Sequence, residues 1–224
     1  MNSIVLEICL DSVESAIAVQ QGGAHRVELC LNLDDGGTTP ESDLIRAVRK
    51  NIAIPLHVMI RHRAGNFCYS ADELEAMKKQ IATARDLGAD GVVIGALKTD
   101  RSLDYGTVES LVRLARPMSV TFHRAFDEAL EPQQVLEDLI SLGIDRLLTS
   151  GCKPTAAEGI PMIADLMRIA DGRIVIMPGS GISSVNIRTI AEKTGAREFH
   201  VRRGVETPDH VVDQKLVGEI LRNV

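Results

Sequence analysis

The chain has few aromatic side chains and no excess of basic ones. It contains no tryptophan, and phenylalanine and tyrosine make up 3% of its 224 residues. Asp and Glu number 31 against 25 Lys and Arg, which gives a formal net charge of −6. Proteins that bind nucleic acids place basic side chains against phosphates and aromatic rings against bases. The composition therefore argues against a nucleic-acid partner.

Signals for membrane insertion, export and disulfide formation are also missing. The first basic residue is Arg26, so no positively charged segment precedes an apolar one as in a secretory leader. No uncharged apolar run reaches the roughly 18 residues of a membrane span. The four cysteines, at positions 9, 30, 68 and 152, form no CxxC pair. We expect a cytoplasmic protein with reduced thiols and no membrane partner.

A weak internal repeat organises what is present. A glycine followed by a short, mostly apolar run occurs four times, starting at Gly23, Gly88, Gly143 and Gly195. Glycine supplies the left-handed conformation that ends many helices, and near-continuous apolar runs are typical of parallel strands covered on both faces. Each repeat therefore indicates a helix end followed by a buried strand.

Counting such runs predicts eight strands, each followed by a helical pattern. Their expected ranges are 4–9, 26–30, 56–61, 91–96, 119–123, 146–150, 173–177 and 198–201. Capping-box spacing at Asp11 with Glu14, and at Ser70 with Glu73, predicts two of the helix starts. Eight regular units of about 28 residues predict one α/β domain over residues 1–224, a (β/α)8 TIM-type barrel. The alternative is an open doubly wound sheet, which the lack of a glycine-rich nucleotide fingerprint disfavours.

Polar residues recur near the ends of the expected strands, where barrels carry their chemistry. Residues two apart share one face of a strand, and two neighbouring strands repeat the order Glu-x-Cys. If that face points inward, the mouth holds two carboxylates, one guanidinium and two imidazoles: Glu7, Glu28, Arg61, His123 and His200. We expect Arg61 to bridge the two glutamates. Paired carboxylates and imidazoles suit proton transfer, and the alternative is a neutralised polar plug without chemistry.

Small-residue loops follow the last two expected strands. Gly179, Ser180 and Gly181 come after the seventh, and Arg202 follows the eighth. Many barrels bind phosphate at these places, because exposed backbone N–H groups stabilise an anion. We therefore expect an anion-binding site there, the alternative being glycines that only form tight turns. The loop over residues 61–69 could close over such an anion or be a solvated loop.

Soft sulfur ligands on adjacent strands support a metal site. Cys9, Cys30 and Met59 would suit Cu(I) better than a hard cation, and Cys68 and Cys152 are further candidates on loops. The two favoured ligands are Cys9 and Cys30, with Met59 and His123 less favoured. The alternative is that these side chains only fill the core.

Several long stretches resemble one known family. They are LEICLDSVESA at 6–16, GGAHRVELC at 22–30, GGTTP at 36–40, HVMIR at 57–61 with FCYS at 67–70, VTFHRAFD at 120–127 and LTSG at 148–151. Together they resemble the CutC copper-homeostasis family. The resemblance implies a TIM barrel of the cytoplasm, a homodimer, and a role in copper handling.

The resemblance also implies site residues. The marked positions of the family fall on Glu7, Glu28, Arg61, His123 and the run 149–151, and its cysteine ligands on Cys9 and Cys30. Two departures stand out. The loop at 61–67 reads RHRAGNF where the family usually reads RPRGGDF, and Val-Arg-Arg follows His200 where the family usually has small polar residues.

Three hypotheses follow from the sequence. The first is a copper-homeostasis protein that binds Cu(I) through Cys9 and Cys30. The second is a barrel enzyme with acid–base chemistry of the isomerase or lyase type on a small anionic or phosphorylated metabolite. In it Glu7 or Glu28 is the base, His123 the acid and Arg61 the anion clamp. The third is a non-catalytic binding or scaffold barrel, in which Glu7→Gln or Arg61→Met changes stability alone.

Overall fold

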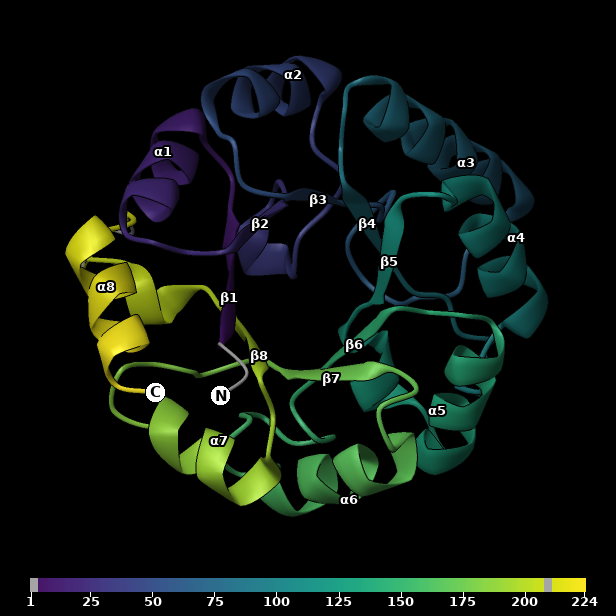
Figure 1. Ribbon diagram of the computed structural model, residues 1–224. Coiled ribbons are helices and arrows are strands. Elements are labelled where there is room, and N and C mark those ends of the chain that lie inside the picture. Colours follow the sequence, from purple (N-terminus) through teal and green to yellow (C-terminus); the bar gives the residue numbers. More distant parts are fainter. Residues whose placement is uncertain (1–3, 208–210) are drawn as a thin grey trace.

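Eight parallel strands form one sheet that curls into a nearly closed barrel (Figure 1). The computed structural model describes residues 4–207 and 211–224. Its strands are β1 (Val5–Leu10), β2 (Arg26–Leu29), β3 (Leu56–Met59), β4 (Gly91–Ile94), β5 (Ser119–Phe122), β6 (Arg146–Thr149), β7 (Val175–Pro178) and β8 (Glu198–Val201). Every strand begins and ends within two residues of the range expected from the sequence.

The strand order identifies the architecture. Successive strands from β1 to β7 pair in sequence, and β1 also pairs with β8, with Glu7 opposite His200. The first and last strands are therefore neighbours, which an open doubly wound sheet does not allow. The TIM-type barrel is confirmed, and the alternative of an open sheet is wrong.

Helices form a ring around the strands (Figure 1). They are α1 (Val13–Gln21), α2 (Ser42–Asn51), α3 (Ala71–Asp86), α4 (Tyr105–Ala115), α5 (Pro132–Ser141), α6 (Ile160–Ala170), α7 (Ile187–Thr194) and α8 (Gln214–Arg222). Helix α8 packs beside α1, so the two ends of the chain meet in the ring. Among the helices of the described residues, none has the length and apolarity to cross a membrane.

The alternation of side chains along each strand separates two environments. On β1, Leu6, Ile8 and Leu10 join the large apolar core under the helices. Cys9, between them in sequence, belongs to a second, small cluster inside the barrel. The period-2 pattern thus gives the outer layer its apolar packing and leaves the inner face of the strands for polar groups and sulfur.

One of the two predicted helix starts is as expected. Ser70 and Glu73 form a capping box at the start of α3, each side chain accepting from the other's backbone N–H. The prediction of Asp11 as the cap of α1 is wrong. The cap is Ser12, whose hydroxyl accepts the amide of Ser15 at 3.2 Å, because the helix starts one residue later than the spacing indicated.

Candidate functional site

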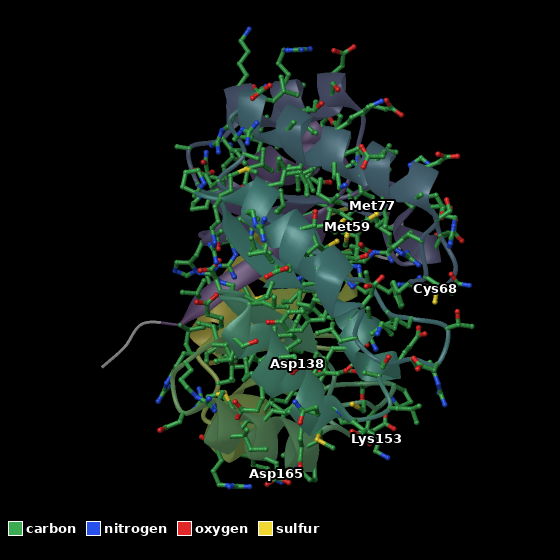
Figure 2. All side chains as sticks on the ribbon, turned by 90° about the vertical axis from the view of Figure 1, so that its right-hand side faces the viewer. Met59, Cys68, Met77, Asp138, Lys153 and Asp165 are labelled. Carbon is green, nitrogen blue, oxygen red and sulfur yellow. The ribbon has the colours of Figure 1, made fainter. Side chains whose placement is uncertain are left out.

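The carboxyl ends of the strands surround a cavity of about 540 Å³. The loops after β3 and β6, which carry Cys68 and Lys153, lie on this same side of the molecule (Figure 2). Residues from β1, β2, β3, β6 and β8 line the cavity, together with the loops that follow β2, β3, β5, β7 and β8. The polar and sulfur-bearing ones are Cys9, Glu28, Cys30, Asp35, Met59, Arg61, His123, Arg124, Asp127, Glu128, Ser180, His200, Arg202 and Arg203. We call this space the mouth cavity.

Two thiols lie side by side on its floor. The Sγ atoms of Cys9 and Cys30 are 3.7 Å apart, and both residues are buried. They form a small cluster with Met59 and Val93, apart from the main core. Cys68 and Cys152 are in loops and half-buried. The strand pairing thus brings together the two cysteines that the repeated Glu-x-Cys pattern singled out.

Both thiols of this pair are protonated at neutral pH. The hydrogen bond with Cys30, together with burial, raises the pKa of Cys9 well above its usual value. Burial raises the pKa of Cys30 to about 12. The Sγ of Cys30 in turn lies 3.6 Å from the Glu28 carboxylate, to which it donates. A metal ion that binds here must therefore displace thiol protons.

Gly37 covers the thiol of Cys30. A side chain at this position would put its Cβ 3.2 Å from the Cys30 Sγ and 3.5 Å from the Met59 Cε. Its φ of +85° also lies in the region that favours glycine. The loop after β2 can therefore approach the sulfur cluster only with a glycine at this point.

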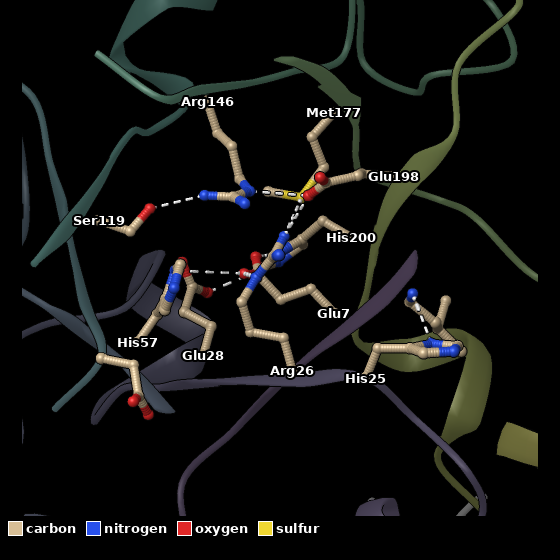
Figure 3. Close-up of polar contacts among 12 residues, drawn as sticks. Glu7, His25, Arg26, Glu28, His57, Ser119, Arg146, Met177, Glu198 and His200 are labelled. Carbon is tan, nitrogen blue, oxygen red and sulfur yellow. Dashed lines mark hydrogen bonds and ion pairs between the residues drawn. The ribbon is translucent and has the colours of Figure 1, made fainter. Parts of the chain in front are cut away.

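A layer of charged groups lies beneath the floor (Figure 3). Glu7 is fully buried and forms an ion pair with Arg26. Arg26 also binds Glu198 at 2.7 Å, and Glu198 binds Arg146 at the same distance. Burial alone would raise the pKa of Glu7, but the Arg26 charge, the hydrogen bond with His200 and the His200 and His57 charges together outweigh it and hold that pKa well below its usual range. Glu7 is thus a fixed carboxylate below the mouth cavity, a poor position for the base proposed from the sequence.

His200 connects this layer to the floor. Its Nδ1 is 2.9 Å from Glu7 and its Nε2 is 3.6 Å from Glu28. Burial alone would lower the pKa of His200, but the two carboxylates hold it well above its usual value. Burial raises the pKa of Glu28, and the Oε1 of Glu28 has no hydrogen-bond partner among the described residues.

Ligand atoms for a metal converge at two overlapping places. One group consists of Cys9, Glu28 and Cys30, and the other of Glu7, Glu28 and His200. Within each group the ligand atoms lie within 4.8 Å of one another. The first group contains the two soft sulfur ligands that Cu(I) prefers, and Met59 lies beside it. The residues present therefore fit Cu(I). His123 belongs to neither group.

Arg61 does not bridge Glu7 and Glu28, so that expectation is wrong. Its guanidinium instead donates to three backbone carbonyls, those of Asp35, Gly37 and Gly65, at 2.7 to 3.0 Å. The side chain extends outward to the loops after β2 and β3, while Arg26, one layer down, takes the ion pair with Glu7. Arg61 is 5% exposed and lines the mouth cavity.

His123 is a neutral imidazole at the end of β5. Its Nδ1 accepts the backbone N–H of Ala125 at 3.1 Å, and its Nε2 has no partner among the described residues. Burial and the nearby Arg61 charge lower the pKa of His123 to about 3. Its ring lies directly over Gly95, where any Cβ would come within 2.3 Å of it.

The loop predicted to bind an anion contributes in part. Ser180 and Gly181 line the mouth cavity, whereas Gly179 donates its N–H to Thr149 and packs against Leu148. Arg202 also lines the cavity. Its guanidinium is engaged with the carbonyl of Leu33 and with Asp34.

The loop after β6 is fixed by a residue to which the sequence assigned no role. Asp127 accepts hydrogen bonds from the hydroxyls of Thr149 and Ser150 and from the backbone N–H of Ser150 and Cys152. It also pairs with Arg124 at 2.8 Å. These bonds fix the run 149–151, which does not itself line the mouth cavity, against Asp127, which does.

Sequence reasoning missed the charged layer of Arg26, Arg146 and Glu198. A signal was available, because Arg26 lies two residues before Glu28 and Glu198 two before His200. Continuing the inward face of β2 and β8 two residues toward the start of each strand would have found Arg26 and Glu198.

The chain is similar to proteins of one family along most of its length. A model described as the CutC family matches residues 4–205. A human protein named copper homeostasis protein cutC homolog is 49% identical over 199 residues, which cover 89% of this chain and 73% of the human one. A CutC family protein of Bacteroides fragilis is 44% identical over 234 residues, covering 100% of this chain and 93% of its own.

Solved structures agree with these matches. The crystal structure of CutC from Streptococcus agalactiae has a TM-score of 0.84 at 32% identity, covering 88% of this chain and 97% of that one. Thiamine phosphate pyrophosphorylase from Pyrococcus furiosus has a TM-score of 0.68 at 16% identity, covering 98% of this chain and 95% of its own. This second likeness shows a shared barrel fold alone.

Proposed function

Because the chain belongs to the CutC family, we propose that it is a copper-homeostasis protein that binds Cu(I) through the thiolates of Cys9 and Cys30. The observation that supports this proposal is the 3.7 Å separation of the two Sγ atoms on adjacent strands. A single ion can contact both sulfurs without a change in the barrel. Thiolate is a soft ligand, and soft ligands select Cu(I) over hard cations.

The surroundings of the pair favour a monovalent ion. Val93 and the thioether of Met59 form the apolar side of the cluster. Met59 is 4% exposed, so water has little access to the sulfurs from that side. An apolar shell reduces oxidation of a bound Cu(I) ion by excluding solvent.

Replacement of both cysteines by serine tests the proposal. We expect the wild-type protein to take up one Cu(I) ion in anaerobic competition with a chromophoric Cu(I) chelator. The Cys9→Ser, Cys30→Ser double variant should lose this ion. The matched control is the Cys68→Ser, Cys152→Ser double variant, which leaves the pair intact and should bind as the wild type does. Unchanged affinity in the first variant would rule out this site.

The cellular setting belongs to the same proposal. The resemblance to the family supports a location in the cytoplasm and assembly as a homodimer. Light scattering on the purified protein tests the second point, because a homodimer has twice the 24.3 kDa mass of the chain. A mass of one chain at micromolar concentration would contradict it.

A further inference from the structure

The mouth cavity contains a buried positive charge without a counter-ion. The other arginines of the cavity each have a carboxylate partner: Arg124 pairs with Asp127, and Arg202 and Arg203 pair with Asp34. Arg61 donates hydrogen bonds to backbone carbonyls, lies over the Phe67 ring, and forms no ion pair with any part of the chain that the structure describes. Burial of an unpaired guanidinium is costly, and a bound anion would offset that cost.

Two N–H donors of this region lack an acceptor. The Nε of Arg61 is buried and without a partner among the residues described. The same holds for Nε2 of His123. Because Nδ1 of His123 accepts the Ala125 amide, the proton of the neutral ring lies on Nε2. Buried donors without acceptors are rare in folded proteins and call for a ligand or an ordered water.

The ring of Phe67 contacts both donor side chains, so the three lie together on one side of the cavity. Its ring centroid is 5.0 Å from that of His123, and the Arg61 Cζ lies 5.0 Å from the Phe67 ring. Leu148 and Ile182 add further apolar lining. A cavity with a few polar groups set in an apolar lining is typical of sites for small organic molecules.

Two further groups complete the chemistry of the cavity. The Oε1 of Glu28 is a buried acceptor on the floor without a donor among the described groups. Across the mouth, the backbone N–H groups of Gly181 and Ile182 donate to no acceptor within the described residues. The Glu28 oxygen can accept a hydrogen bond from a ligand hydroxyl. The two backbone N–H groups can donate to a further oxygen of an anion.

We propose that the mouth cavity binds a small hydroxylated organic anion, whose oxyanion group accepts hydrogen bonds from Arg61 Nε and His123 Nε2. A carboxylate and a phosphate ester share this chemistry. The two donors are separate from the sulfur pair of the copper proposal, since neither Arg61 nor His123 belongs to the groups of metal-ligand atoms, whereas Glu28 belongs to both groups.

Calorimetric titration of the intact protein with three probes tests the proposal. Glycerate and glycerol 3-phosphate carry the hydroxyls with a carboxylate or a phosphate, and inorganic phosphate carries the anion alone. We expect one of the two organic probes to bind more tightly than inorganic phosphate, and the one that binds identifies the oxyanion. Failure of both organic probes to bind at millimolar concentration, or equal binding of inorganic phosphate, overturns the proposal.

Two substitutions locate the site. In His123→Asn, the amide oxygen can still accept the Ala125 N–H while the Nε2 donor is lost. Arg61→Lys keeps the charge and removes the Nε donor. Each variant should bind the organic probe about tenfold more weakly or worse, as for loss of one charge-assisted hydrogen bond. Wild-type affinity in both variants contradicts the assignment.

Two controls separate this proposal from the copper proposal and from misfolding. The metal-free wild-type protein should bind the organic probe whatever its Cu(I) affinity in the chelator competition. On the wild-type protein, proton–nitrogen correlation spectra of guanidinium and imidazole groups should show one Arg Nε–H and one His Nε2–H signal that shift with the probe. Spectra in which no such signal moves overturn the proposal even if the variants do not fold.

Discussion

Arg26 balances the charge of the barrel interior. Its guanidinium contacts both Glu7 and Glu198, and its side chain is 6% exposed. The side chain of Glu7 is fully buried and that of Glu198 is 14% exposed. One cation thus contacts two anions, and its removal leaves the fully buried Glu7 without its main partner, while Glu198 keeps Arg146.

We predict that Arg26→Met lowers the free energy of unfolding by about 3–5 kcal/mol, the usual cost of breaking a buried ion pair from one side. Urea denaturation followed by circular dichroism measures it. The matched control is Arg46→Met, since the Arg46–Asp43 pair is exposed and contributes about 1 kcal/mol or less. Equal effects of the two substitutions would show that the interior pair is not a major source of stability.

For single residues, the sequence predicted which side chains point into the barrel, but it did not predict which of them form ion pairs with one another. The Glu-x-Cys repeat correctly placed Cys9 beside Cys30, because alternation on neighbouring strands fixes which side chains meet. The partner of Glu7 was misassigned to Arg61. Strand register sets this choice: Glu7 lies opposite Arg26, whereas Arg61 lies beyond the end of β3. Spacing within a segment carries no information on register between segments.

Strand β4 gives two imidazoles their space. Its inward positions are Gly91 and Val93, followed by Gly95 directly after the strand. The ring of His57 lies over Gly91 and that of His123 over Gly95, both within 2.5 Å of where a Cβ would be. The small residues of one strand thus permit large polar residues on both neighbours.

We predict that Gly95→Ala destabilises the protein by about 1–3 kcal/mol, because the added methyl group must displace the buried ring of His123. It should also weaken binding of the organic anion. The control is Gly106→Ala in α4, where the new Cβ meets no atom within 4 Å and alanine favours the helix by up to about 1 kcal/mol. Thermal denaturation compares the two, and a stable Gly95→Ala protein would contradict this account of β4.

The elements themselves were largely predictable, and the loops were not. Glycine-ended helices and apolar runs located all eight strands, because those signals are local. The helix start at Ser12 was missed by one residue, since Asp11 and Ser12 are both good caps and spacing alone favoured the first. The role of Asp127 depends on a contact between the loops after β5 and β6, which no local pattern encodes.

Closure of the barrel ties the ends of the chain together. Strand β1 pairs with β2 on one side and β8 on the other, and α1 packs against α8. We predict that residues 1–224 unfold as one cooperative domain in urea, with coincident transitions by circular dichroism and tyrosine fluorescence. Two separated transitions would show that part of the barrel folds independently.

Buried neutral histidines make the whole molecule sensitive to acid. Burial lowers the pKa of His57 to about 4 and that of His123 to about 3, from 6.5 in the unfolded chain. Between pH 6.5 and about 4 the unfolded chain therefore binds protons that the folded one does not. Stability should fall as the pH falls through this window, by on the order of 1 kcal/mol per pH unit for each histidine.

Urea denaturation across this pH window tests the prediction. The His123→Asn variant lacks one of the two titrating groups, so its stability should fall less steeply than that of the wild type. Its separation from the wild type should be greatest above pH 6.5, where both histidines are neutral in either state. Parallel pH profiles would contradict a neutral, buried His123.

Gly37 lies between the proposed anion site and the sulfur pair of the mouth cavity. Its carbonyl accepts from Arg61 at 3.0 Å, and a Cβ at this position would lie 3.2 Å from the Cys30 Sγ, so its backbone covers that thiol. An anion that binds the Arg61 guanidinium therefore acts, through Gly37, on the segment that covers the sulfur pair. Thermodynamic linkage then requires reciprocity: the factor by which the anion changes Cu(I) affinity equals the factor by which Cu(I) changes anion affinity. Under the two proposals, copper occupancy therefore depends on metabolite concentration.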